Sequence, residues 1–281
     1  MQLLDNIAAL RNTITHWRQQ GLRIGFVPTM GNLHQGHLAL VKTAQQHCDK
    51  VIVSIFVNPM QFDNASDLTA YPRTLAQDCT QLESLADAVF TPTSELMYPS
   101  GQQQHTRVTV PGIADVLEGV LRPGHFDGVS TVVCKLFNLV QPDVAYFGEK
   151  DYQQLALIRT MVKDLNMPID IIGLPTVRDS NGLALSSRNG YLTPNELKLA
   201  PELAASMRHI AKEMTAGKSD MTALANQASA HLNSLGFRTD SIDIVDADTL
   251  GPINEHSQAV VILMAAFLGK ARLIDNQVVP L

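Results

Sequence analysis

Apolar residues near the start of the chain recur at helical spacing. Steps of four and three residues separate the members of this set, which are Leu3, Ile7, Leu10, Ile14 and Trp17. That spacing places them on one face of a helix, and Gly21 is a typical residue just beyond a helix end. The next run, 23–27 (RIGFV), has the length and apolar character of a strand.

Helical patterns and short apolar runs then alternate along the chain. The helical patterns cover 38–47, 75–85, 129–139 and 152–165, and the extended runs cover 51–57, 88–90, 144–147 and 169–174. A nearly all-apolar run such as VIVSIFV is typical of parallel strands covered on both faces. The alternation predicts an α/β fold with a Rossmann-like, doubly wound parallel sheet. We expect the loops after Val27, Val57 and Phe147 to share one crevice, where such sheets bind ligands.

The pattern changes near residue 175. A strong turn signal, Asp179–Gly182, is followed by helical patterns at 194–215 and 221–235 and by extended runs at 241–245, 259–266 and 271–275. We therefore predict two domains: a Rossmann-like domain over residues 1–175 and a smaller α+β domain over residues 176–281.

The charge balance argues against a broad nucleic-acid surface. The chain of 281 residues has 27 acidic and 21 basic side chains, a formal net charge of −6, and no basic block. Proteins that neutralise nucleic-acid phosphates normally present a basic face. We expect no nucleic-acid partner, and any bound anion should meet a few well-placed cations.

The cysteines and the apolar segments indicate a cellular compartment. Cys48, Cys79 and Cys134 are far apart and odd in number, so neither a disulfide framework nor a zinc cluster is predicted, and free thiols suit a reducing compartment. The N-terminus lacks signal-peptide features, and the longest apolar stretch, 259–268, is too short to span a bilayer. We expect a soluble, cytoplasmic protein with no membrane partner.

The strongest local motif is the segment His34–His37 (HQGH), between a predicted strand and a predicted helix. A helix N-terminus offers unpaired N–H groups and a positive dipole end, which suit a phosphate. Gly36 lets the backbone approach closely, and two imidazoles three residues apart can point the same way. They could donate hydrogen bonds to a phosphate oxygen as charge builds in a transition state. Zinc is the alternative, but it usually needs three or four protein ligands.

Two further polar segments contain cations. Gly148–Asp151 (GEKD) directly follows a predicted strand, so Lys150 could offset phosphate charge and Asp151 could bond a ribose hydroxyl or cap the next helix. Leu185–Asn189 (LSSRN) follows the predicted turn near the domain junction. Its hydroxyls and Arg188 would form a mobile anion clamp, since guanidinium pairs with phosphate in a bidentate fork. Taken alone, each segment could equally be a solvated polar loop.

Two glutamines also stand out as candidate ligand contacts. Gln61 lies in the loop after the apolar strand 51–57, and Gln154 lies just after the GEKD segment. A side-chain amide both donates and accepts, so each suits a hydroxyl or a carboxylate. Met30 could pack against a small aliphatic substrate, although ordinary core packing is the simpler interpretation.

Six segments in one order carry a resemblance to a known family. They are PTMGNLHQGH (28–37), FVNPMQF (56–62), YPRT (71–74), RPGHFDGVSTVV (122–133), FGEKDYQQL (147–155) and LALSSRNGYL (183–192). With them the chain resembles the pantothenate synthetase family, which shares the HxGH signature of a nucleotidyltransferase superfamily. The family usually has alanine at the position of Asn32, so only local loop geometry is in question there.

The resemblance implies a specific reaction. The family condenses pantoate with β-alanine through a pantoyl-adenylate intermediate, consuming ATP and releasing AMP and pyrophosphate, in the pathway to coenzyme A. Mg²⁺ accompanies the phosphates. The resemblance also implies a cytoplasmic homodimer, with ATP and pantoate sites in the larger domain and a smaller domain that closes over them.

The resemblance further implies roles for individual residues. Catalysis would use His34, His37, Lys150 and Arg188, with His37 as the proton donor or charge stabiliser. ATP would contact Met30, Gly31, Asn32, Leu33, His34, Gln35, Gly36, His37, Gly148, Glu149, Lys150, Asp151, Val177, Leu185, Ser186, Ser187 and Arg188. Pantoate would contact Gln61 and Gln154, and β-alanine would also contact Gln61. Asp78 is the candidate magnesium contact, and Tyr71 and residues 122–126 would gate the pocket.

Three other functions compete with this ligase. Another HxGH nucleotidyltransferase would stop at a nucleotidyl product such as a dinucleotide, and the HxGH loop alone does not separate it from the ligase. A nucleotide-binding module without turnover is a second alternative, and a zinc protein using His34 and His37 is a third. The two glutamines and the SSRN loop favour the ligase.

Overall fold

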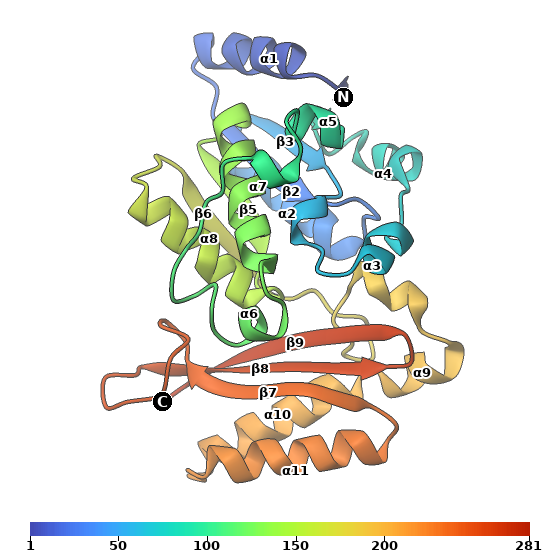
Figure 1. The fold of residues 1–281 in the computed structure, drawn as a ribbon, viewed down its shortest axis with the longest axis vertical. Coiled ribbons are helices and arrows are strands. Elements are labelled where there is room, and N and C mark those ends of the chain that lie inside the picture. Colours follow the sequence, from blue (N-terminus) through green and yellow to red (C-terminus); the bar gives the residue numbers. More distant parts are fainter. The chain divides into compact units, whose positions relative to one another are not determined.

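The structure is a computed structural model that describes residues 1–281. The chain divides into two compact units, each with its own sheet (Figure 1). Unit 1 comprises Met1–Glu149 and Gln153–Pro175, and unit 2 comprises Lys150–Tyr152 and Thr176–Leu281. No helix is long and apolar enough to cross a membrane.

Unit 1 is built on a six-stranded sheet in which every neighbouring pair is parallel. The spatial order is β1-β4-β3-β2-β5-β6. The strands are β1 (Gln2–Leu4), β2 (Ile24–Thr29), β3 (Lys50–Ile55), β4 (Ala88–Phe90), β5 (Val144–Gly148) and β6 (Asp170–Leu174). The predicted α/β fold with a parallel sheet is confirmed.

Helices cover both faces of this sheet, as a doubly wound fold requires. The first face packs against α1 (Ile7–Gln19), α7 (His125–Val140) and α8 (Tyr152–Asp164), and the second against α2 (Gln35–His47) and α4 (Leu75–Leu82). Successive residues of one strand serve opposite faces, because Phe26 belongs to the first cluster and Val27 to the second. Unit 1 also contains short helices: η1 (Pro59–Gln61), α3 (Ala65–Ala70), α5 (Ser94–Met97), η2 (Gln102–Gln104) and α6 (Glu118–Leu121).

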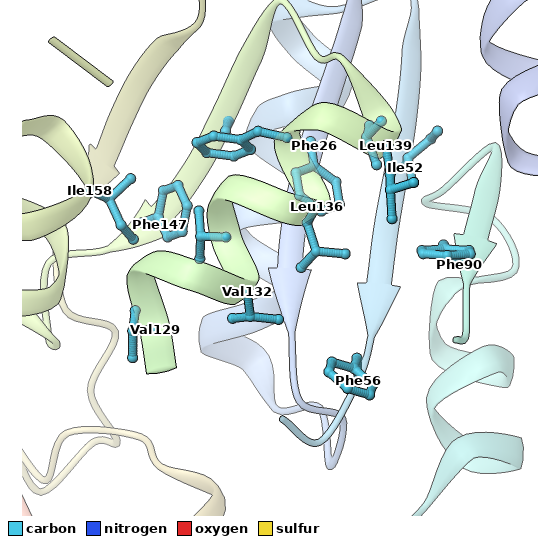
Figure 2. Close-up of a cluster of buried hydrophobic side chains, with 14 of the residues drawn as sticks. Phe26, Ile52, Phe56, Phe90, Val129, Val132, Leu136, Leu139, Phe147 and Ile158 are labelled. Atoms are coloured by element: carbon cyan, nitrogen blue, oxygen red, sulfur yellow. The ribbon is translucent and has the colours of Figure 1, made fainter. Parts of the chain in front are cut away.

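Helix α7 is the centre of the larger core. Figure 2 shows Val129, Val132 and Leu136 of this helix in one buried cluster with two aromatic residues of the sheet, Phe26 and Phe147. The helix predicted at 129–139 is confirmed, and most of its side chains are buried, including the polar Ser130 and Thr131. The helix itself begins at His125, after Gly124 in the left-handed region with φ 80°, four residues earlier than the apolar pattern predicts.

The predicted N-terminal helix is wrong at its start. Residues 2–4 form β1, which pairs with β4, and Leu3 is 58% exposed. The helix begins at Ile7, because the Asn6 side chain caps it by accepting a hydrogen bond from the Ala9 N–H group. Leu10, Ile14 and Trp17 are buried as predicted.

Unit 2 contains an antiparallel sheet in the order β7-β8-β9, with helices α10 and α11 against it (Figure 1). The strands are β7 (Arg238–Asp246), β8 (Ala259–Leu268) and β9 (Ala271–Pro280). The helices are η3 (Ser187–Tyr191), α9 (Pro194–Leu199), α10 (Glu202–Thr215) and α11 (Met221–Ser234). The helical pattern at 194–215 is therefore divided between two helices, with Pro201 immediately before α10, since proline lacks the N–H that a continuous helix needs.

Candidate active site

The candidate site of unit 1 lies at the point where the strand order reverses. Strands β2, β3 and β4 progress toward one edge of the sheet, and β5 then returns to the other side of β2. Ligands of doubly wound sheets bind beyond the carboxyl ends of the strands at this switch point. The loop Met30–His34 follows β2, and Gly148 ends β5. The topology therefore brings two of the predicted ATP segments to one position.

The loop after β2 has a specific backbone conformation. The Thr29 hydroxyl donates to the Ser54 carbonyl oxygen (2.8 Å) and accepts from the Gly31 N–H group (3.2 Å). Gly31 and Asn32 both have positive φ, at 81° and 50°. Asparagine adopts the left-handed region more readily than most residues, so Asn32 suits this turn despite its departure from the resembling family.

Asp78 anchors the same loop from helix α4. Its side chain is fully buried, and its carboxylate accepts hydrogen bonds from the N–H groups of Asn32 (3.0 Å) and Leu33 (2.8 Å). The Thr74 hydroxyl donates a third bond (3.1 Å). A Cβ atom on Gly31 would lie 3.1 Å from the carboxylate, so glycine lets the loop approach this closely. Asp78 therefore binds backbone N–H groups of the loop. Its contact with magnesium stays a prediction.

The two histidines of the HxGH motif form the N-terminal cap of α2. Nδ1 of His34 accepts a hydrogen bond from the Gly36 N–H group (3.1 Å), and Nδ1 of His37 accepts from the His34 N–H group (3.3 Å). The ring centroids lie 4.1 Å apart. Because both Nδ1 atoms accept, the proton of each neutral ring is on Nε2. Each ring therefore carries its N–H group at Nε2.

Gln61 is held in place by a chain of buried polar groups. The Asn58 amide donates to Gln61 Oε1 (3.0 Å), and Asn58 Oδ1 in turn accepts from the Tyr98 hydroxyl (2.7 Å). Gln61 Nε2 then approaches Met30 Sδ at 3.2 Å, which joins the loops after β2 and β3. Asn58 and Tyr98 were not among the predicted site residues, although a polar Asn58 directly after an apolar strand was a signal for the first of them.

A second contact set fixes the backbone of Gln61. The ring of His125, at the start of α7, donates from Nδ1 to the Gln61 carbonyl oxygen (2.7 Å), and its Nε2 accepts from the Arg122 guanidinium (3.2 Å). Arg122 also reaches Asp63 (3.4 Å). Burial, with Arg122 as a second cause, lowers the pKa of His125 to about 4, against the opposing effects of the Gln61 carbonyl, Glu118 and Asp63. His125 is therefore a neutral structural support near the pocket that segment 122–126 was predicted to gate.

We expect the buried neutral His125 to make the protein less stable in mild acid. Its folded pKa of about 4 lies below the unfolded value near 6.5, so the unfolded chain binds more protons between these values. Its contribution to stability is complete above pH 6.5 and falls as the pH drops toward 4, by about 2 kcal/mol at pH 4.5. Urea unfolding at pH 7.5 and 4.5 measures the loss.

The matched variant for this prediction is His125→Asn. Asparagine keeps a donor near the position of Nδ1 and does not titrate, so it should lose about 2 kcal/mol less than the natural protein between the two pH values. Equal losses in both proteins would show that His125 is not the group responsible.

Unit 2 holds the predicted cationic segments. Lys150 and Asp151 belong to it, although they follow β5 of unit 1 in the sequence. Val177 accepts a backbone hydrogen bond from Leu185 (3.0 Å), and the Ser186 hydroxyl caps η3 by accepting from the Arg188 N–H group (3.2 Å). This cap fixes the backbone that presents Ser187 and Arg188. The predicted ATP residues are thus divided between the units, with Met30–His37, Gly148 and Glu149 in unit 1.

Two further predicted site residues, Gln154 and Tyr71, differ in their burial. Gln154 is half-buried on α8, whereas its neighbour Gln153 is buried and donates to the carbonyl oxygens of Ile113 and Val116 (both 2.8 Å). Tyr71 is also buried and packs against Phe62. No group of three or more His, Cys, Asp or Glu side chains is placed so that it could hold a metal ion, and a zinc site on His34 and His37 would need such a group.

Comparison with known proteins gives one consistent family. The family model described as Pantoate-beta-alanine ligase matches residues 2–278. The chain is 65% identical to the pantothenate synthetase of Aeromonas hydrophila, over all of this chain and 99% of that one. It is 58% identical to the pantothenate synthetase of Photobacterium profundum, over all of this chain and 96% of that one.

Solved structures agree with the sequence comparison. A pantothenate synthetase from Thermus thermophilus superposes with a TM-score of 0.91 at 43% identity, covering 99% of both chains. A pantoate-β-alanine ligase from Francisella tularensis, complexed with β-γ ATP and β-alanine, gives a TM-score of 0.81 at 40% identity, covering 99% of this chain and 97% of that one. The chain therefore belongs to the pantoate–β-alanine ligase family.

Proposed function

We propose that the protein joins pantoate to β-alanine at the cost of ATP, through a pantoyl-adenylate intermediate. The observation that carries the proposal is the contact between the two loops at the switch point. The loop with His34 and His37 would bind phosphate in this proposal, and Gln61 of the next loop reaches it at Met30. An amide donor beside a phosphate-binding helix N-terminus suits a carboxylate that must attack a phosphate.

The first step activates the acid. A pantoate carboxylate oxygen attacks the α-phosphorus of ATP, and the bond from that phosphorus to the pyrophosphate oxygen breaks. Negative charge increases on the phosphate oxygens in the transition state, so preorganised donors lower the barrier. The Nε2–H groups of His34 and His37 supply such donors, and Lys150 and Arg188 supply positive charge. The remaining predicted ATP contacts position the nucleotide.

The second step transfers the acyl group. The β-alanine amine attacks the acyl carbon of the adenylate, AMP leaves with the electrons of the broken bond, and the amine loses a proton. Neither step needs a nucleophile from the protein, so the task of the chain is alignment and charge stabilisation. Gln61 and Gln154 hold pantoate in this proposal, and Gln61 also contacts β-alanine.

Magnesium would bind mainly to the phosphates of ATP. Mg²⁺ commonly keeps several waters and takes one or two carboxylates together with substrate phosphates, so it does not need a complete protein cage. Asp78 is the proposed protein contact for the ion, although its buried carboxylate also accepts hydrogen bonds from Asn32, Leu33 and Thr74. When bound, the ion would supply positive charge that offsets the charge of the phosphates. A homodimer and a cytoplasmic location complete the proposal.

We expect the purified protein to catalyse ATP–pyrophosphate exchange when Mg²⁺ and pantoate are present and β-alanine is left out. The first step is reversible, so labelled pyrophosphate enters ATP only if the acyl adenylate forms. The control omits pantoate, and exchange should then fall to background. A folded protein that binds ATP but gives no pantoate-dependent exchange would contradict the proposal and favour another nucleotidyltransferase or a module without turnover.

A further inference from the structure

The segment Lys150–Tyr152 packs with unit 2, although the chain on either side of it belongs to unit 1. Two hydrogen bonds hold it there. The Asn276 amide donates to the Lys150 carbonyl oxygen (2.8 Å), and the Tyr152 hydroxyl donates to the Ala247 carbonyl oxygen (2.9 Å). The backbone that carries Lys150 is therefore fixed by strand β9 and by the residue that follows β7.

The neighbour of Asn276 holds the other cationic segment. Asp275 is buried and forms an ion pair with both terminal nitrogens of Arg178, at 2.5 and 2.8 Å. Arg178 also donates to the Gly182 carbonyl oxygen (3.2 Å) and forms a backbone bridge with Ala184. The hairpin 177–185 thus rests on Asp275 and leads directly into Ser186–Arg188.

The two segments meet at these adjacent residues of β9. Lys150, Ser186 and Asp275 line one small cavity within unit 2, and Asn276 is itself only 8% exposed. A lysine ammonium is carried on four flexible methylenes, so its position depends on a fixed backbone. Asn276 holds the backbone of Lys150, and Asp275 holds the hairpin that leads to Arg188.

We infer that Asn276 is a positioning residue that holds Lys150 in a fixed relation to Ser186–Arg188. The inference rests on the role proposed above for Lys150 in binding the phosphates of ATP. Preorganised cations stabilise developing charge without reorganising during the reaction. Loss of the Asn276 amide should therefore weaken the action of Lys150 on ATP and leave the acid and amine substrates unaffected.

A double-mutant cycle with Lys150 tests this inference. We expect Asn276→Ala to raise the KM for ATP or lower kcat/KM for ATP by about tenfold, with the KM for β-alanine unchanged within about twofold. In the Lys150→Ala background, the same change should alter kcat/KM by less than about twofold, because its target is gone. The control is Asn226→Ala on the exposed surface of α11, which should leave all constants unchanged.

The possible results distinguish a wrong positioning role for Asn276 from a wrong phosphate-binding role for Lys150. The positioning role would be overturned if Asn276→Ala lowered kcat/KM for ATP equally with and without Lys150. It would also be overturned if Lys150→Ala lowered kcat/KM for ATP while Asn276→Ala did not. Wild-type kinetics for Lys150→Ala would overturn the role of Lys150 first and the inference with it. If Asn276→Ala fails to fold, Tyr152→Phe carries the same cycle, since it removes the hydroxyl bond to Ala247 that also holds this segment. We expect it to lower kcat/KM for ATP about threefold, only when Lys150 is present.

Discussion

We expect His37→Ala to lower kcat by about three orders of magnitude, the usual effect of removing one preorganised donor to a transition-state charge. Nδ1 of His37 accepts the His34 N–H group at 3.3 Å, so its proton is on Nε2, where it can meet a phosphate oxygen. The change removes that donor and also one element of the helix cap. Pantoate-dependent ATP–pyrophosphate exchange isolates the affected step, because it does not involve β-alanine.

His37→Asn separates the two functions of the ring. The Asn oxygen lies near the position of Nδ1 and can keep the cap, but asparagine has no donor near the position of Nε2. We expect both variants to show a much lower rate of ATP–pyrophosphate exchange. Only His37→Ala should also lose about 1 kcal/mol of stability. The control is His16→Ala, an exposed histidine on α1. Near-normal exchange by a folded His37→Asn would show that His37 is a helix cap without a catalytic role.

The sequence was most informative where a short-range pattern decides the structure. Continuous apolar runs form the central parallel strands, and the helical pattern at 129–139 lies within α7. The HxGH motif was placed correctly at the start of α2 because strand, loop and helix follow one another directly. Positions that depend on partners distant in the sequence were not predictable in this way.

Long-range partners account for the differences. Leu3 continues a helical stripe, yet residues 2–4 pair with β4 at residues 88–90, and three residues alone show no strand pattern. Asp78 was predicted only as a magnesium contact, and it is buried beneath the loop that it holds. Lys150 lies 126 residues from Asn276, its hydrogen-bond partner. No local pattern encodes such a contact, so the roles of Asp78 and Asn276 required the tertiary structure.

We expect Gly128→Ala to destabilise unit 1 and to damage the pantoate pocket together. A Cβ atom at this position of α7 would lie 2.3 Å from the Met60 carbonyl oxygen and 2.7 Å from the Gln61 N–H nitrogen. Both are backbone atoms and cannot move aside by rotation of a side chain. Overpacking of this kind costs about 2–3 kcal/mol, and it should shift η1, because the Gly128 carbonyl oxygen also accepts from Asn58 (3.1 Å).

The displacement of η1 should also impair turnover and the binding of pantoate. Gln61 ends η1, so its amide would leave its position against Met30, and a displacement of about 1 Å near the chemistry can reduce turnover about a hundredfold. We expect a higher KM for pantoate and a lower kcat, with ATP binding by calorimetry little changed, since the loop Met30–His37 is held separately by Asp78. Gly190→Ala is the matched control, because a Cβ there meets no atom within 4 Å. A Gly128→Ala protein with unchanged stability and pantoate KM would show that α7 and η1 can separate without affecting Gln61.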